Sequence, residues 1–481
     1  QGGFQEVEQM NLFKDMVCYQ EEVRDPSRMA EVLNRVIEKA FRGSAPAQIN
    51  VPRDYWTQVI DIELPPIVRF ERQGGGKEAI DKAAKILSEA KFPVILSGAG
   101  VVIGDAIEDC KKLAEKLDAP VCSGYQHNDS FPGNHPLAVG PLGYNGSKAA
   151  MQLISKADVV LALGTRLNPF STLPGYGIDY WPKKASIIQV DMNPDRIGLT
   201  KKVTVGICGD AKMVSQQLLT KLSKNAGNND REERKNIIHQ TKSAWLQTLS
   251  GLDHEEDDPG TVWNKEARER DNDRMSPRQA WRAIQVAIPQ EAIISSDIGN
   301  NCAIGNAYPT FEKGRKYLAP GLFGPCGYGF PSILGAKIGC PDTPVIGFAG
   351  DGAFGISMNE MSSCARKEWP AITMVIFRNY QWGAEKRNSI LWFDDNFVGT
   401  ELDPELSYAK VANACGLKGV TVKTMEETTK AIKQSCDDQK KGITTFIEII
   451  LNQELGEPFR RDAMKKPVKV AGINKNDMKS Q

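Results

Sequence analysis

The sequence has little of the features that mark several common classes of protein. Its 481 residues include four His and ten Cys, and none is spaced as a ligand pair for zinc, so ordinary roles are expected for His127, His135, His239 and His254. Lys and Arg number 60, as do Asp and Glu, which leaves no net charge for binding a nucleic acid. The longest apolar runs, such as 158–163 and 445–451, are far shorter than the ~18 residues of a membrane-spanning helix. Neither nucleic acids nor membranes are therefore expected as partners.

The ten cysteines stand singly, without a C-x-x-C motif. This usage is typical of a reducing compartment, and it predicts a cytoplasmic protein. The chain opens with Gln1-Gly2-Gly3-Phe4, which lacks both Met and the pattern of a signal peptide. We therefore expect the natural N-terminus to lie upstream of Gln1.

Apolar periodicity predicts an α/β protein with three regions of alternating strands and helices. Residues 77–222 and 276–455 each contain continuous apolar strands separated by helices, which predicts two complete doubly wound parallel-sheet domains. Residues 1–60 contain a helix at 26–41, with Asp25 as its N-cap, and a strand at 47–51, so they are expected to be the C-terminal remnant of a third such domain. The remaining segments are expected to be a linker at 61–76, a charged, solvated linker at 223–274 with one helix near 237–249, and a tail at 456–481.

The most informative motif is Gly350-Asp351-Gly352-Ala353-Phe354, in which Gly352 is followed by 26 residues and then by Asn379. Asp351 and Asn379 each follow an apolar strand, so they are expected side by side at the carboxyl edge of one sheet, where ligands bind in open α/β folds. A helix is expected to begin at once, with Ser357 and Glu360 spaced as a capping box. A carboxylate, an amide oxygen and a glycine-rich backbone suit Mg²⁺ bound to a diphosphate. The alternative, a simple Asp-Gly turn, would be preferred only if the triplet stood alone.

Two upstream segments complete the expected site. Asp297-Ile298-Gly299-Asn300-Asn301 follows another strand and offers two amide side chains to a second phosphate, with a plain Asn-rich turn as the alternative. Gly324-Pro325-Cys326-Gly327-Tyr328-Gly329-Phe330-Pro331 places glycines around one soft apolar residue ahead of a helix. Such gaps leave room for a cofactor that lies against the backbone.

Together these motifs resemble the magnesium–diphosphate signature of thiamine-diphosphate enzymes, and the whole chain resembles the acetolactate-synthase-like branch of that family. The resemblance likens residues 1–60 to the end of the pyrimidine-binding domain, 77–222 to the central domain and 276–455 to the diphosphate-binding domain. It implies that Asp351, Asn379 and the backbone carbonyl of Gln381 bind Mg²⁺. The implied cofactor-binding residues are Asn300, Asn301, Gly350, Gly352, Ala353 and Phe354 around the diphosphate, Cys326 beneath the bent cofactor, and Gln5 near the thiazolium ring.

Three further stretches, 379–388, 397–402 and 454–461, resemble the sulfoacetaldehyde acetyltransferases within that branch. Members of that family convert sulfoacetaldehyde and phosphate into acetyl phosphate and sulfite, so their site must admit two anions. Lys386, Arg387, Arg460 and Arg461 are therefore candidates for contacts with sulfonate or phosphate. The alternative is that each of them is a solvated surface residue.

The sequence departs from the family pattern at the group that activates the cofactor. The family uses a glutamate early in the pyrimidine-binding domain, and Gln1 is expected to lie after it, so no residue is assigned that role and Gln5 is only a candidate catalytic contributor. The family also builds each site between two subunits, which implies a homodimer or homotetramer. Two other functions stay open. One is acetohydroxyacid synthesis or another thiamine-diphosphate carboligation or decarboxylation, and the other is a non-catalytic fragment or subunit that binds Mg–diphosphate.

The central region carries Gly98-Ala99-Gly100 and Gly104 after a strand, a loose match to a dinucleotide-binding fingerprint. No acidic residue about 20 positions later completes that fingerprint convincingly. A structural role of these glycines is therefore preferred over a bound nucleotide.

Overall fold

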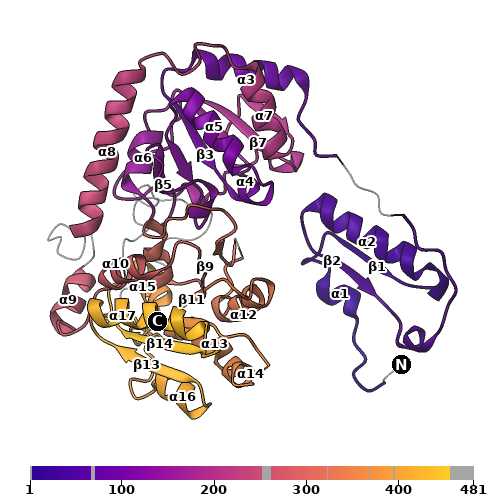
Figure 1. The fold of residues 1–481 in the computed structure, drawn as a ribbon, viewed down its shortest axis with the longest axis vertical. Coiled ribbons are helices and arrows are strands. Elements are labelled where there is room, and N and C mark those ends of the chain that lie inside the picture. The colour runs from indigo at the N-terminus through magenta and orange to yellow at the C-terminus, as the bar shows by residue number, and fades with distance from the viewer. Residues whose placement is uncertain are drawn as a thin grey trace. The chain divides into compact units, whose positions relative to one another are not determined.

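The computed structural model describes residues 3–66, 71–251, 262–321, 323–366, 368–393 and 396–455. The chain forms two compact units, Gln1–Arg72 and Gln73–Gln481, which are described separately (Figure 1). The first contains a two-stranded sheet and the second contains two six-stranded sheets. All strand pairs within these sheets are parallel, which confirms the predicted α/β class.

In the first unit, one helix packs on a parallel pair of strands. The elements are α1 (Gln9–Phe13), β1 (Tyr19–Glu22), α2 (Met29–Gly43) and β2 (Ala47–Asn50). The Asp25 carboxylate accepts a hydrogen bond from the backbone N–H of Ser27 at 2.9 Å, so it caps the 3-10 turn that leads into α2, as predicted.

Helix α2 has apolar residues on two stripes, and only one of them packs within this unit. Val32 and Val36 are buried against Val23. Three other apolar residues of α2 are exposed, at 43, 45 and 77% (Leu33, Ile37 and Phe41). The apolar spacing thus predicts the helix correctly, but it does not by itself identify the buried face.

The first sheet of the second unit has the strand order β5-β4-β3-β6-β7-β8. In chain order this is 3-2-1-4-5-6, the order of a doubly wound fold that reverses between its two central strands. The strands are β3 (Pro93–Ser97), β4 (Val121–Ser123), β5 (Ala138–Pro141), β6 (Val159–Leu163), β7 (Ser186–Asp191) and β8 (Val205–Cys208). The helices are α3 (Lys77–Glu89), α4 (Ala99–Ile103), α5 (Ile107–Leu117), α6 (Lys148–Ile154) and α7 (Ala211–Lys221). Every residue of β3 and β6 is buried, as continuous apolar strands predict.

The glycines of the dinucleotide-like segment pack against a neighbouring turn. A Cβ atom on Gly98 would lie 2.6 Å from the carbonyl oxygen of Gly164, and one on Gly100 would lie 2.7 Å from the Gly164 Cα. The backbone N–H of Gly100 donates to the Gly164 carbonyl at 2.8 Å. The glycine spacing therefore serves close backbone packing where the sheet order reverses, in agreement with the structural role preferred from the sequence.

The helix expected near 237–249 is longer than predicted. It is α8 (Arg231–Gly251), which packs on α6 (Figure 1). Arg234 is buried, and its guanidinium donates to five backbone carbonyls, including those of Asp118 at 3.0 Å and Leu117 at 3.1 Å. Because these bonds anchor its first turn, this stretch is not the solvated linker expected from its charge. Residues 252–261 of the same segment lie outside the described residues.

The second sheet of this unit has the order β10-β9-β11-β12-β14-β13 and reverses between β9 and β11. Its strands are β9 (Ile293–Ser296), β10 (Tyr317–Leu318), β11 (Val345–Gly350), β12 (Thr373–Arg378), β13 (Lys418–Val422) and β14 (Thr445–Ile450). The helices are α9 (Val262–Arg270), α10 (Pro277–Ala287), α11 (Asn300–Ile304), α12 (Gly329–Gly339), α13 (Asp351–Ser357), α14 (Met361–Cys364), α15 (Gly383–Trp392), α16 (Tyr408–Ala414) and α17 (Met425–Gln439). Gly350 of β11 is paired with Phe377 of β12, so the residues that follow these two strands emerge beside each other.

Two helix starts of this domain differ in their capping. Ser276 caps α10 in a complete capping box with Gln279. The box expected from Ser357 and Glu360 is wrong, because α13 already begins at Asp351 and ends at Ser357, whose side chain makes no capping hydrogen bond. The helix expected after Ser357 is reduced to a 3-10 turn and the four-residue α14.

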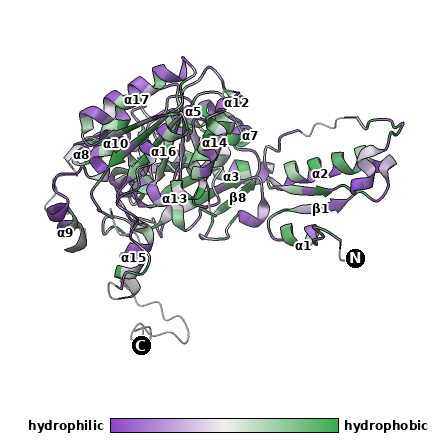
Figure 2. Cartoon of the chain, turned by 90° about the horizontal axis from the view of Figure 1, so that it is seen from below, coloured by the Kyte–Doolittle hydropathy of each residue, from purple (hydrophilic) through white to green (hydrophobic). Residues whose placement is uncertain are grey.

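The outer helices of the second unit are amphipathic, with polar outer sides and apolar inner sides. In Figure 2, α17 is predominantly hydrophilic, although Ile432 and Cys436 on its inner side are buried. Among the described residues, no helix combines the length and the apolar character needed to cross a membrane.

Candidate cofactor-binding site

Three neighbouring strands bring the motif residues to one edge of the second six-stranded sheet. Asn300 and Asn301 follow β9, residues 350–354 lie at the end of β11, and Asn379 follows β12. The sheet order reverses between β9 and β11, which is where ligands bind in open α/β folds. Asp351 and Asn379 lie one and two residues beyond the paired residues Gly350 and Phe377, so they have the side-by-side placement that the sequence predicts.

The Asp351 carboxylate is buried and is held at both oxygens. Its Oδ2 accepts from Nη1 of Arg378 at 3.1 Å and from the backbone N–H of Tyr380 at 2.7 Å, and its Oδ1 accepts from the backbone N–H of Gly352 at 2.9 Å. Burial raises the pKa of Asp351 from 3.8 to about 6, although the nearby Arg378 charge opposes this rise. A bound cation would offset the lost hydration, so the carboxylate is suited to a metal ion.

Asn379 and Gln381 add oxygen atoms at the same edge. Oδ1 of Asn379 and Oε1 of Gln381 are buried and accept no hydrogen bond from any described residue. Tyr380, between them, has φ of +61°, a left-handed backbone that a bulky residue rarely adopts outside functional sites. Buried oxygens without donors, next to a carboxylate, fit Mg²⁺, because this ion prefers oxygen ligands.

The two glycines of the motif have different surroundings. A Cβ atom on Gly350 would meet no atom within 4 Å, whereas one on Gly352 would lie 2.8 Å from the ring of Trp382. Gly350 therefore leaves open space beside its backbone, and its contact with a cofactor stays a prediction. At Gly352 the expected open space is filled by the indole, so the absence of a side chain there serves the packing of Trp382.

The two asparagines after β9 present amide groups that protein contacts do not fully use. Oδ1 of Asn300 accepts a hydrogen bond from the hydroxyl of Tyr144 at 3.0 Å. Nδ2 of Asn300 and Oδ1 of Asn301 are buried and have no hydrogen-bond partner among the described residues. An amide N–H without an acceptor suits a phosphate oxygen, so Asn300 fits the predicted diphosphate contact.

Ala353 and Phe354 are both buried at the start of α13. The Phe354 ring packs 5.4 Å from that of Phe330 and 5.1 Å from that of Tyr408, measured between ring centres. Its side chain thus belongs to the hydrophobic core. Only the backbone of this residue remains for the predicted contact with a diphosphate.

Asp297, at the end of β9, organises the glycine-rich loop that carries Cys326. Its Oδ2 accepts from the backbone N–H of Gly329 at 2.7 Å, and its Oδ1 accepts from that of Gly327 at 3.1 Å. Gly327 has φ of +86°, a conformation that glycine adopts without strain. The loop leaves the Cys326 thiol exposed, and the position of Cys326 beneath a cofactor stays a prediction.

Lys386 and Arg387 lie on α15 and are only 2 and 3% exposed, so a solvated surface role is wrong for both. The Lys386 ammonium contacts the Glu401 carboxylate and lies 3.4 Å from Oε1 of Gln453. The central carbon of the Arg387 guanidinium lies 5.5 Å from the ring centre of Tyr144. Arg387 therefore lies beside Tyr144, the residue whose hydroxyl contacts the Asn300 amide.

The structure leaves the roles of three predicted residues untested. Gln5 belongs to the first unit, and its predicted approach to the thiazolium ring stays a prediction. Arg460 and Arg461 lie outside the described residues.

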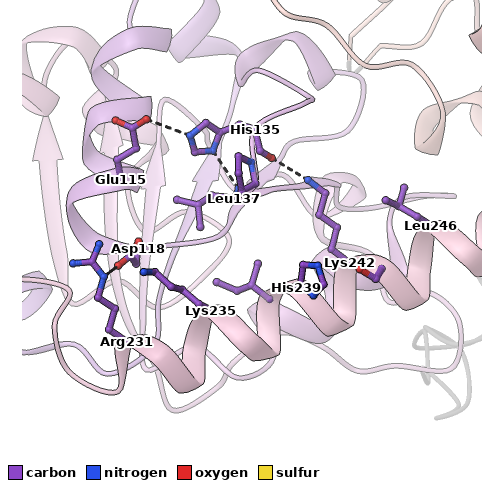
Figure 3. Close-up of a pocket in the computed structure, with 12 residues that line it drawn as sticks. Glu115, Asp118, His135, Leu137, Arg231, Lys235, His239, Lys242 and Leu246 are labelled. Carbon is purple, nitrogen blue, oxygen red and sulfur yellow. Dashed lines mark hydrogen bonds and ion pairs between the residues drawn. The ribbon is translucent and has the colours of Figure 1, made fainter.

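A cavity of about 670 Å³ lies between α8 and the central domain (Figure 3). Several of its charged groups are engaged with one another or with the backbone: Arg231 pairs with Asp118, His135 lies 3.3 Å from Glu115, and Lys242 donates to the His135 carbonyl at 2.9 Å. None of the predicted site residues lines this cavity. The sheet edge with the motif residues is therefore the better candidate for the functional site.

Reasoning from the sequence missed two residues of the site. Arg378 directly precedes Asn379 at the end of a buried strand. A buried charge needs a partner, so this lone arginine could have indicated a nearby carboxylate. Tyr144 lies 156 residues from Asn300 along the chain. No local pattern links these two residues, because the contact arises only when the two domains of the second unit pack together.

Comparison with known proteins matches most of the second unit to family models. Residues 80–218 match the model described as thiamine pyrophosphate enzyme, central domain, and residues 297–449 match the model described as thiamine pyrophosphate enzyme, C-terminal TPP binding domain. The chain resembles the crystal structure of benzoylformate decarboxylase from Polynucleobacter necessarius with a TM-score of 0.73 and 20% identity, over 93% of this chain and 78% of that chain. That structural likeness supports the fold.

Several relatives are similar over all or most of the chain. The chain is 77% identical to the probable sulfoacetaldehyde acetyltransferase of Rhizobium meliloti, over 100% of this chain and 81% of that protein. It is 75% identical to the sulfoacetaldehyde acetyltransferase of Roseovarius nubinhibens, over 100% of this chain and 80% of that protein. Its identity to the probable acetolactate synthase large subunit of Methanococcus aeolicus is 28%, over 90% of this chain and 73% of that protein.

Proposed function

Because the chain belongs to the thiamine pyrophosphate enzymes and, within them, to the sulfoacetaldehyde acetyltransferase family, we propose that it converts sulfoacetaldehyde and phosphate into acetyl phosphate and sulfite. The observation that carries this proposal is the identity of 68–77% over all 481 residues to three sulfoacetaldehyde acetyltransferases. Identity to acetolactate synthase large subunits is 26–28%. Acetohydroxyacid synthesis is therefore the less supported function.

The residues at the sheet edge fit thiamine diphosphate and Mg²⁺. Asp351, Asn379 and the backbone carbonyl of Gln381 would hold the metal ion, and Asn300 and Asn301, with the backbone of residues 350–354, would hold the diphosphate. Support comes from the buried amide atoms that have no hydrogen-bond partner in the described part of the chain and from the open space beside Gly350. When bound, thiamine diphosphate supplies the carbon nucleophile that adds to an aldehyde carbonyl.

The part played by the protein is to hold this edge in one geometry. The Arg378 guanidinium and the Tyr380 N–H fix Oδ2 of Asp351, and the Tyr408 hydroxyl donates to the Asp351 backbone carbonyl at 2.9 Å. A carboxylate held in this way loses little further freedom when a metal ion binds. Such preorganisation increases affinity by reducing the entropic cost of binding.

Of the two buried cations on α15, Arg387 is proposed to bind an anion, either the sulfonate or the phosphate. A planar guanidinium can donate to two oxygens at once, and a site shielded from water strengthens that attraction. Lys386 is proposed instead to hold α15 in place, since its ammonium is engaged by Glu401 and Gln453. Arg460 and Arg461 stay as candidates for the second anion.

The test supplies sulfoacetaldehyde and phosphate, with thiamine diphosphate and Mg²⁺, and measures sulfite and acetyl phosphate together. Release of both in equal amounts is expected. In a parallel assay that supplies pyruvate, release of CO₂ together with no sulfite from sulfoacetaldehyde would indicate acetohydroxyacid synthesis, and cofactor binding without any product in either assay would indicate a non-catalytic role. Asp351→Asn should abolish the Mg²⁺-dependent reaction, whereas Asp437→Asn, which changes an exposed carboxylate on α17, should leave it intact.

The role of Arg387 can be tested separately by steady-state kinetics. Arg387→Lys keeps the positive charge but loses the planar guanidinium group, so it should raise the KM for one of the two anions about tenfold, with a smaller effect on kcat. Arg366→Lys is the matched control, because Arg366 is an exposed arginine of the same domain. Unchanged KM values for both substrates in Arg387→Lys would remove Arg387 from the site.

We further propose that the protein is a homodimer or homotetramer in the cytoplasm. The oligomer is suggested by the family resemblance, and light scattering of the purified holoenzyme tests it. All ten cysteines are free thiols, which suits a reducing compartment. Cell fractionation tests the location.

A further inference from the structure

Tyr144 joins the two domains of the second unit at the predicted diphosphate site. It lies in the loop that follows β5 of the central domain and is buried. Its hydroxyl donates to Oδ1 of Asn300, at the start of α11 in the other domain, at 3.0 Å. Its backbone carbonyl accepts from Nδ2 of Asn306 at 3.2 Å. One residue of the central domain is therefore held in contact with the segment that carries the diphosphate-binding asparagines.

The hydrogen bond from Tyr144 determines which way the Asn300 amide points. Because the hydroxyl occupies Oδ1, the amide group directs Nδ2 elsewhere, and this nitrogen is buried without an acceptor among the described residues. A Cβ atom on Gly383 would lie 3.0 Å from this nitrogen, so the start of α15 comes close to it. Without the tyrosine hydroxyl, the amide could rotate by 180° and present its oxygen to the diphosphate instead.

The ring of Tyr144 also supports the cation proposed to bind a substrate anion. The Arg387 guanidinium lies over this ring at 5.5 Å, a distance at which an arginine is attracted to an aromatic face. The ring is itself fixed by edge contact with Phe170, whose ring centre is 5.9 Å away. Tyr125 packs on the same phenylalanine at 4.9 Å. The contacts within this aromatic cluster thus fix the position of the ring on which the Arg387 guanidinium packs.

We propose that Tyr144 is a positioning residue with two separable roles: its hydroxyl orients the Asn300 amide toward the diphosphate, and its ring seats Arg387 for an anionic substrate. The second role rests on the function proposed above, whereas the first concerns cofactor binding alone.

Two variants of the holoenzyme test the role of the hydroxyl and the role of the ring separately. Tyr144→Phe should raise the Kd of thiamine diphosphate about tenfold in the presence of Mg²⁺, measured by tryptophan fluorescence, and should leave both substrate KM values within about twofold. Tyr144→Leu should raise the Kd and also the KM for the anion that Arg387 binds. Tyr125→Phe is the matched control, because its hydroxyl is buried in the same cluster without a hydrogen-bond partner among the described residues, and neither constant should change.

A double-mutant cycle tests whether Tyr144 acts through Asn300. In an Asn300→Ala background, Tyr144→Phe should raise the Kd no further, since the amide that it orients is gone. A Tyr144→Phe enzyme whose Kd stays within twofold of wild type, or an additive loss in the cycle, would overturn the first role. Unchanged KM values in Tyr144→Leu would overturn the second. If the wild-type enzyme released no sulfite, the proposed reaction would fail, but the cofactor titrations would still decide the first role.

Discussion

Removing the buried Arg378 charge should destabilise the cofactor domain more than any other single change at the sheet edge. The guanidinium donates to Oδ2 of Asp351 at 3.1 Å and to the Leu406 carbonyl at 3.0 Å, and it lies 3.8 Å from the Glu448 carboxylate. All three charged side chains are 1–2% exposed. Arg378→Met would leave two buried carboxylates without their shared cation. Breaking a buried ion pair from one side costs about 3–5 kcal/mol, so a loss of that size is expected.

The loss should be measured as local stability, because the chain contains several domains and a single unfolding transition is not guaranteed. Amide hydrogen exchange of β11 and β12 gives the opening free energy of the two strands that carry the site. Arg366→Met is the control, since Arg366 is 62% exposed in its pair with Glu368 and should cost no more than about 0.5 kcal/mol. An Arg378→Met variant that loses less than about 1 kcal/mol of protection would refute the view that this arginine compensates two buried carboxylates.

Three further predictions concern the same edge and its surroundings. Asn379→Leu should weaken Mg²⁺-dependent binding of thiamine diphosphate about a hundredfold in a fluorescence titration, because it removes the buried oxygen that has no donor among the described residues. Gly352→Ala should lower the opening free energy of β11 and β12, measured by amide hydrogen exchange, by about 1–3 kcal/mol, because the new methyl group meets the Trp382 ring, whereas Gly350→Ala should leave that opening free energy nearly unchanged and weaken only cofactor binding. Burial lowers the pKa of His127 from 6.5 to about 4, so the unfolded chain binds more protons than the folded protein in this range, and stability present above pH 6.5 should fall by up to about 3 kcal/mol as the pH approaches 4. His127→Gln should flatten that part of the pH–stability curve.

The central strands of both large sheets could be predicted closely from the sequence. The apolar run at 372–377 predicts a strand that is observed as β12 (Thr373–Arg378), and the apolar run at 344–349 predicts a strand that is observed as β11 (Val345–Gly350). Buried parallel strands are covered on both faces, so they appear as continuous apolar runs that need no knowledge of tertiary contacts. The side-by-side placement of Asp351 and Asn379 follows from these two strands and the parallel topology alone.

Features that depend on few residues or on distant partners could not be predicted in the same way. Strand β10 has two residues, and β5 has only two buried residues of four, so neither produces a recognisable apolar run. The burial of Lys386 and Arg387 could not be predicted either, because a charged pair on a helix normally indicates a solvated surface. Glu401, which partners Lys386, lies 15 residues away, and no spacing rule connects them.

Two motif residues of the site share a feature that the motif itself does not reveal. Both are held by a side chain from another segment: Asp351 by Arg378, 27 residues later, and Asn300 by Tyr144, 156 residues earlier. The motif determines which chemistry the edge can support, whereas the partners determine how rigidly it is presented. Removing the Asp351 carboxylate should therefore abolish the reaction. Substitutions of Arg378 and Tyr144 should instead weaken cofactor binding while the remaining activity still yields acetyl phosphate and sulfite in equal amounts.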